Sequence, residues 1–96
     1  MLLEQNPGEA KKLYADLMNE NPGVRGYRYN YAIASIMVDD FDEAIKDLNL
    51  VIREGYRDPD MAIRPAIKRL ARQKPEEFKK LVALLTEEDQ ALQENP

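Results

Sequence analysis

Several residue types that support catalysis are missing from this 96-residue chain. It has no cysteine, no histidine and no tryptophan, and its only serine and threonine are Ser35 and Thr86. Ser-His and Cys-His pairs, histidine or thiolate metal sites and disulfides are therefore excluded. No glycine-rich phosphate loop is present either. These absences predict a non-catalytic protein with no cofactor and no metal, and they leave the redox compartment open.

The chain also lacks a strong excess of either sign of charge, and it has no long apolar run. The net charge is -4, and about a third of the residues are charged with both signs mixed, so nothing draws the chain as a whole to nucleic acid or to an anionic membrane. No apolar run approaches the roughly 20 residues that span a bilayer, and the apolar start at residues 1–3 is too short for a signal peptide. We expect one soluble domain over residues 1–96, cytoplasmic if it is natural.

A helical pattern over residues 39–54 recurs through the chain. Its apolar residues follow steps of three and four, which places them on one side of a helix: Phe41, Ala44, Ile45, Leu48, Val51 and Ile52. The pattern returns 34 positions earlier, from Pro7 to Met18, and 34 positions later, from Pro75 to Thr86. A period kept across three copies predicts an all-α repeat protein with five antiparallel helices, or six, stacked as hairpins.

Proline, glycine and the apolar periodicity predict where the helices lie. We expect helices over about 9–19, 24–38, from a cap at Asp39 and Asp40 to 54, over 65–73, and from 75 to 85. Residues 86–94 form either a short last helix, started by a capping box at Thr86, or a continuation of the one before. Pro65 either kinks a helix that starts near Asp60 or begins the helix itself, and we favour the second.

Caps and buried stripes follow from the same patterns. The carboxylates of Asp39 and Asp40 are expected to cap the helix that follows, Gly55 to close it in a left-handed conformation, and Asp58 to cap the next one ahead of Pro59. The first helix is expected to bury Ala10, Leu13, Tyr14, Leu17 and Met18. One face of the second helix is expected to consist of Tyr27, Tyr31, Ala34 and Val38.

The repeat resembles the tetratricopeptide repeat family, whose units are helix hairpins of 34 residues. The resemblance is strongest over residues 26–54, in Tyr29-Asn30, Ala32 at the close-packing site, the run Phe41 to Ile45, and the pair Val51-Ile52. It covers about two and a half units, from residue 7 to 85. Some positions depart from the family pattern: Arg28 and Ser35 replace the usual aromatic residues, Phe78 replaces a small alanine, and Pro65 has no counterpart.

The resemblance implies one candidate site. Peptide-binding members of the family hold a partner's C-terminal carboxylate with asparagine and arginine or lysine on the concave side of first helices. Asn30 and Arg64 fall on two such positions, and an amide with a guanidinium can hold a carboxylate by charge-assisted hydrogen bonds. Asp60 stands where a clamp lysine is expected. Asn30 and Arg64 are thus the candidate peptide-binding residues.

Two charged clusters have plainer explanations. The acids Asp39, Asp40, Asp42 and Glu43 lack the spacing of a calcium-binding loop, and capping accounts for them. The basic residues Arg64, Lys68, Arg69, Arg72 and Lys74 form a one-signed face, which either binds an acidic peptide or phosphate backbone or simply faces solvent opposite the acidic helices. We favour the solvated face.

Two functions of different classes remain. One is a non-catalytic, tetratricopeptide-repeat-like scaffold, engineered or designed de novo and without an evolved activity. The absence of Cys, His and Trp, the incomplete first unit and the proline at 65 favour this hypothesis. The alternative is a natural interaction module that binds an acidic or C-terminal peptide in its concave groove. The surface beside the first helix is covered by residues 86–96, by a second copy in a homodimer, or by nothing.

Overall fold

The computed structural model describes residues 5–94, with side chains described as far as Asp89. Its helices are α2 (Pro7–Glu20), α3 (Arg25–Met37), α4 (Phe41–Arg53), α5 (Pro65–Gln73) and α6 (Pro75–Glu94), with a short 3-10 helix, η1 (Met61–Ile63), ahead of α5. Over these residues the fold is all-α, as predicted. None of the helices is both long enough and apolar enough to cross a bilayer.

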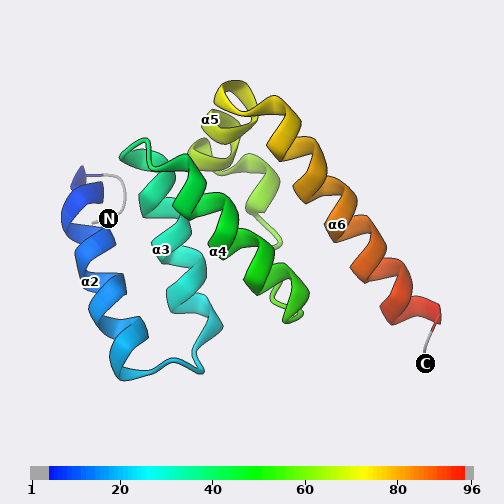
Figure 1. Cartoon of the computed structure of the whole chain (residues 1–96), viewed down its shortest axis with the longest axis horizontal. Helices are drawn as coiled ribbons and strands as arrows, with labels where there is room; N and C mark the ends of the chain where they lie inside the picture. Colours follow the sequence, from blue (N-terminus) through cyan, green and yellow to red (C-terminus); the bar gives the residue numbers. More distant parts are fainter. Residues whose placement is uncertain (1–4, 95–96) are drawn as a thin grey trace.

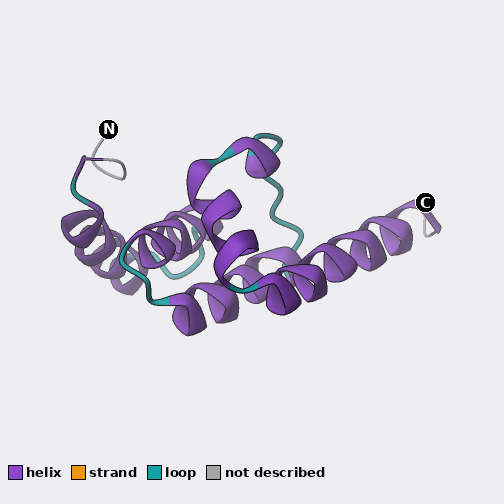
Figure 2. Cartoon of the chain, turned by 90° about the horizontal axis from the view of Figure 1, so that it is seen from above, coloured by secondary structure: helices purple, strands orange, loops and turns teal. Residues whose placement is uncertain are grey.

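The helices form a stack that follows the order of the chain. α2 packs on α3, α3 packs on both α4 and α5, and α6 packs on α4 and α5. Figure 1 shows α2, α3, α4 and α6 side by side from left to right, with α5 near the upper ends of α4 and α6. Seen from above, α6 extends beyond the other helices toward the C-terminus (Figure 2). α5 thus packs on α3 and α6, and α4 packs on α3 and α6.

The helices keep the spacing of the sequence pattern. α2, α4 and α6 begin at Pro7, Phe41 and Pro75, each 34 residues after the one before. The core lies between them and α3 and α5, and its fully buried side chains are headed by Ile36, Leu48, Leu70, Leu81 and Val51. Ala32 and Ala44 are wholly buried, which allows α3 and α4 to approach closely. The 34-residue spacing noted in the sequence is therefore also the spacing of these three helix starts.

The helix starts at residues 7 and 65 are set by local chemistry. Asn6 caps α2 by accepting a hydrogen bond from the Glu9 amide at 3.3 Å, so α2 starts at Pro7, two residues earlier than predicted. At the other proline, Arg64 is extended (φ -67°, ψ 131°) and α5 starts at Pro65. The predicted helix over 65–73 is confirmed, because a residue before proline is driven out of helical geometry.

Two helices end in the same hydrogen-bonded motif. At the end of α4 the Gly55 amide donates to Ile52 O at 3.1 Å and the Tyr56 amide to Val51 O at 2.9 Å, with Gly55 at φ +89°. At the end of α3 Asp39 takes the equivalent place at φ +66°, where a side chain is strained. The left-handed cap at Gly55 is confirmed, and Asp39 proves to be a second one.

The predicted carboxylate caps are wrong. Neither Asp39 nor Asp40 makes a side-chain cap to α4: the N-cap is Asp40, and its carboxylate instead accepts from Lys11 Nζ of α2 at 2.7 Å. Asp39 is paired with Arg69 of α5, whose Nε donates at 3.1 Å. Both acids therefore tie neighbouring helices together, because cations on those helices compete with the backbone amides for them.

One further prediction, the burial of Leu13, differs from the structure. Leu13, expected in the buried stripe of α2, is 45% exposed, and Val38 is 39% exposed at the end of α3. No helix packs over the outer side of α2 in the described residues, so its stripe is buried on one edge only.

Residues 86–94 continue α6 without a break, as in the second of the two alternatives, and Thr86 donates to Val82 O at 3.1 Å within the helix.

Candidate functional site

Asp58 is the centre of a partly buried polar cluster between α3 and the start of α5. Its Oδ1 accepts from the Asp60 amide at 2.9 Å, a local turn that fixes the carboxylate. Its Oδ2 accepts from the Tyr29 hydroxyl at 2.7 Å and is paired with Arg64 Nε. The Asp58 side chain is 7% exposed. Asp58 therefore joins α3 to the start of α5, and it caps no α-helix, contrary to the prediction.

The ionisation of this cluster follows from its contacts. Burial alone favours a neutral Asp58, but the hydrogen bonds from Arg64 and Tyr29 outweigh it and hold the pKa of Asp58 below its usual value. Burial and the bond to Asp58 raise the pKa of the Tyr29 hydroxyl, and the Asp58 partner raises the pKa of Arg64. Near neutral pH the carboxylate is ionised and both donors keep their protons, so this arrangement is suited to holding helices together.

Aromatic rings complete the cluster. The rings of Tyr29 and Tyr56 lie with their centroids 5.1 Å apart and tilted by 39°. The Arg64 guanidinium carbon is 5.9 Å from the centroid of the Tyr29 ring, within range of a cation–π contact. Arg64 is thus held by a carboxylate and by a ring face.

The two predicted peptide-binding residues have different surroundings. Arg64 is at the N-cap of α5, and its charge is already matched by Asp58. Asn30 lies half-buried on α3, and over the part of the chain that the structure describes no hydrogen bond joins it to Arg64. The two residues are on neighbouring helices, since α3 packs on α5, but only Arg64 belongs to the Asp58 cluster.

Tyr29 and Asp58 are the site residues that sequence analysis missed. Tyr29 was noted for its fit to the family pattern, and Asp58 was assigned to a helix cap. The signal for Asp58 was present in Asp58-Pro59-Asp60, a sequence typical of an Asx turn, in which the carboxylate binds the amide two residues on. Nothing local indicates that Tyr29, 29 residues earlier, supplies the second donor.

An open pocket adjoins the Asp58 cluster. Its volume is about 250 Å³, and it lies between the second half of α4, the connection through η1, and α6. The α4 wall consists of Leu48, Val51 and Ile52, and the α6 wall of Phe78, Leu81, Val82 and Leu85. The remaining wall comes from Tyr29, Ile67, Met61, Ala62 and residues 56–59. Only Arg57 and Asp58 in this lining are charged, so the pocket is apolar.

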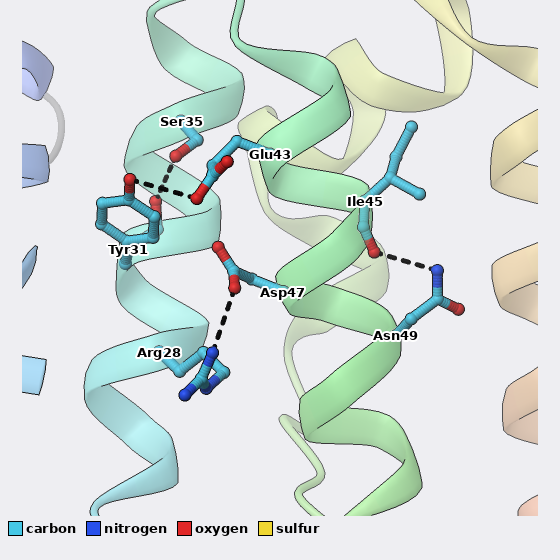
Figure 3. A network of polar contacts seen from close by, with 7 residues as sticks. All are labelled: Arg28, Tyr31, Ser35, Glu43, Ile45, Asp47 and Asn49. Carbon is cyan, nitrogen blue, oxygen red and sulfur yellow. Dashed lines mark hydrogen bonds and ion pairs between the residues drawn. The ribbon is translucent and has the colours of Figure 1, made fainter. Parts of the chain in front are cut away.

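A second polar network lies between α3 and α4 (Figure 3). Arg28 Nη1 donates to Asp47 Oδ1 at 3.3 Å, and the Tyr31 hydroxyl donates to Glu43 at 3.4 Å. Ser35 is buried and donates to Tyr31 O at 2.9 Å. Arg28 thus makes a polar contact to α4, and Ser35 bonds back to its own helix.

Asp47 is the most unusual group of that network. It is 2% exposed, and its Oδ2 is buried without a hydrogen-bond partner. Burial and the neighbouring Glu43 charge raise the pKa of Asp47, and Arg28 opposes this only in part. In Figure 3 one carboxylate oxygen points to Arg28 and the other toward the side of Glu43. A buried acid with a free oxygen is a source of instability when it is ionised.

Metal binding has no support among the described residues. No group of three or more carboxylates among the described side chains, residues 5–89, is arranged to hold a metal ion. The acids Asp39 and Asp40 point to Arg69 and Lys11, on different helices.

Comparisons of the chain with protein-family models, with curated proteins and with solved structures find no match. The functional proposal therefore depends on the residues of this chain.

Proposed function

We propose that this chain is a non-catalytic helical scaffold of the tetratricopeptide repeat type, engineered or designed de novo and without an evolved biochemical activity. Two features support the repeat origin: α2, α4 and α6 start 34 residues apart, and the small residues Ala32 and Ala44 are buried where α3 meets α4. The absence of Cys, His and Trp and the proline that breaks the third unit favour assembly from repeat-like pieces. Full-length natural relatives would contradict the designed origin.

The observation that carries the proposal is the pairing of Arg64 with Asp58. To bind Arg64, a peptide carboxylate would have to displace the Asp58 side chain, which is only 7% exposed and is oriented by its hydrogen bond from the Asp60 amide. An intramolecular competitor acts at an effective concentration of about millimolar or more, and a rigid one exceeds this. Tyr29 would also lose its acceptor. We therefore expect the predicted clamp to be closed by the chain's own Asp58.

The alternative is a peptide-binding module, and one observation favours it. α3 and α5 pack together, so Asn30 and Arg64 come from adjacent helices. Three further basic residues are exposed, Lys68 and Arg72 along α5 and Lys74 at its C-cap. An acidic peptide would gain from these charges even if Arg64 stayed paired, although exposed pairs contribute only about 0 to 1 kcal/mol each.

A peptide titration distinguishes the scaffold from the peptide-binding module. An acidic peptide with a free C-terminal carboxylate is added to isotope-labelled protein, and the amide signals of Asn30 and Arg64 and the Arg64 Nε signal are followed by NMR. The scaffold proposal predicts no saturable shift up to millimolar peptide. Saturable shifts that vanish in Arg64→Ala, persist in Arg53→Ala, which changes an exposed arginine of α4, and need the free carboxylate rather than its amide would instead establish the peptide-binding module.

A further inference from the structure

The pocket between α4 and α6 has room for a small ligand. An apolar cavity of about 150 Å³ stays dry and accepts benzene, whereas sites for drug-sized molecules are about 300 to 1,000 Å³. The present pocket, of about 250 Å³, lies between these sizes and suits one or two fused rings. Val82 lines the pocket and is also 44% exposed, so it stands where the lining meets solvent.

The charges of both charged residues in the lining are matched within the protein, although Arg57 Nη2 is buried without a hydrogen-bond partner. Arg57 Nε donates to Asp89 at 2.9 Å, and Nη1 donates to the carbonyls of Ile52 and Tyr56 at 3.1 and 2.7 Å. Asp58 is engaged by Tyr29 and Arg64. A charged ligand would lose its hydration here without gaining a free counter-ion, which is strongly unfavourable. The pocket therefore suits an uncharged occupant, and the unpartnered Arg57 Nη2 is a donor for an acceptor atom on it.

The aromatic part of the lining indicates the kind of occupant. The rings of Tyr29 and Tyr56 stand at a tilt of 39°, and Phe78 and Met61 belong to the same lining. Ring edges and faces at such angles, and a thioether sulfur, attract aromatic groups beyond the effect of area alone. An aliphatic chain would fill the same volume but would not gain these interactions with the rings and the sulfur.

We propose that this pocket binds an uncharged aromatic small molecule of one or two fused rings. The aromatic group enters beside Val82 and lies between the α4 wall and Phe78, next to the Tyr29–Tyr56 pair. This inference is independent of the proposed scaffold function, because it does not involve Asn30 or require Arg64 to leave Asp58. The site is one that the sequence analysis did not foresee.

Indole is a suitable probe, since it is uncharged and has two fused rings. A ligand of this size binds with a dissociation constant of about 1 mM when it is well seated. Methyl NMR spectra of the full chain are recorded during an indole titration. Saturable shifts are expected at Val51, Ile52, Leu81 and Val82. No saturable shift up to ~10 mM, about ten times that constant, or shifts centred on other residues, would overturn the proposal.

Filling the pocket gives the matched test. Val82→Trp places a bulky ring at the opening and should weaken indole binding at least tenfold. Val24→Trp is the control, because Val24 is 45% exposed and does not line the pocket, and it should change the affinity by less than twofold. Equal losses in the two variants would refute the assignment.

A second pair keeps the test valid if Val82→Trp fails to fold. Ala62 lines the pocket from η1 and is exposed, so Ala62→Leu fills it from outside the α-helices, whereas Ala83→Leu changes an exposed α6 residue that is not in the lining. Only Ala62→Leu should weaken indole binding. Pocket signals that depend on protein concentration and that indole cannot shift would identify a second copy of the chain as the occupant and overturn the small-molecule proposal.

Discussion

Replacing Asp58 with alanine should destabilise the protein by about 3 kcal/mol. The largest part comes from the Tyr29 hydroxyl, which loses its acceptor in a residue that is only 2% exposed, at a cost of about 1 to 3 kcal/mol. Arg64, whose side chain is 36% exposed, turns to water and adds about 0 to 1 kcal/mol. The lost bond to the Asp60 amide adds about 0.5 to 1 kcal/mol.

This loss is large for a chain of 96 residues, whose total stability is about 5 to 14 kcal/mol at typical values per residue. It corresponds to a fall in Tm of about 12 to 24 °C. Urea denaturation followed by circular dichroism measures it directly. Asp89→Ala is the control, because that carboxylate is 53% exposed and pairs with Arg57 at 2.9 Å, and its loss should be at most about 1 kcal/mol.

Two further measurements assign the loss to the cluster. Tyr29→Phe removes only the hydroxyl, and a double-mutant cycle with Asp58→Ala should give a coupling of about 1 to 2 kcal/mol. Because the pKa of Asp58 is lower in the folded protein, its contribution is present above the unfolded pKa of about 4 and is lost as the pH falls through the folded value. The gap between wild type and Asp58→Ala should therefore narrow below about pH 4. A loss below about 1 kcal/mol, or one equal to that of Asp89→Ala, would refute the central place of Asp58.

Three other predictions concern the backbone, the core and the buried acid. Gly55→Ala should lower the free energy of unfolding, measured by urea denaturation, by about 1 to 2 kcal/mol because Gly55 has φ +89°, whereas Gly23→Ala should be nearly neutral. At neither site does an added Cβ meet an atom within 4 Å, so only the backbone conformation distinguishes them, and equal effects would contradict this. Leu48→Ala, at a fully buried site, should cost about 2 to 5 kcal/mol and the exposed Leu13→Ala less than about 1, and a reversed order would disprove the assigned core. Because the pKa of Asp47 is raised in the folded protein, its ionisation lowers the stability of the wild type as the pH rises from about 4. The stability of Asp47→Asn should therefore increase relative to that of the wild type between pH 4 and 7, and a stability difference between the two that does not change with pH would rule this out.

Helix positions were predictable because their signals are local. The starts at Pro65 and Pro75 and the end at Gly55 depend on backbone geometry within one or two residues, and the structure has them where they were expected. The all-α class followed from apolar spacing along single helices. Leu13 was misplaced because a stripe predicts which side of a helix is apolar, but not whether another element covers its full width.

The partners of charged groups were not predictable. A carboxylate near a helix start can bind a backbone amide, water or a distant cation, and the free energies of these choices are similar. Asp40 is paired with Lys11, Asp39 with Arg69, and Asp58 with Tyr29, each across 29 or 30 residues. These contacts arise only when the helices are stacked.

The sequence by itself thus determined the helical class, the 34-residue interval and most helix boundaries, since these depend on periodicity and on proline and glycine. Only the tertiary structure decided that Arg64 is held by Asp58 and that an apolar pocket remains between α4 and α6. Both depend on how separate helices approach one another, because ion pairs and pockets are properties of surfaces that meet in space and have no fixed spacing along the chain.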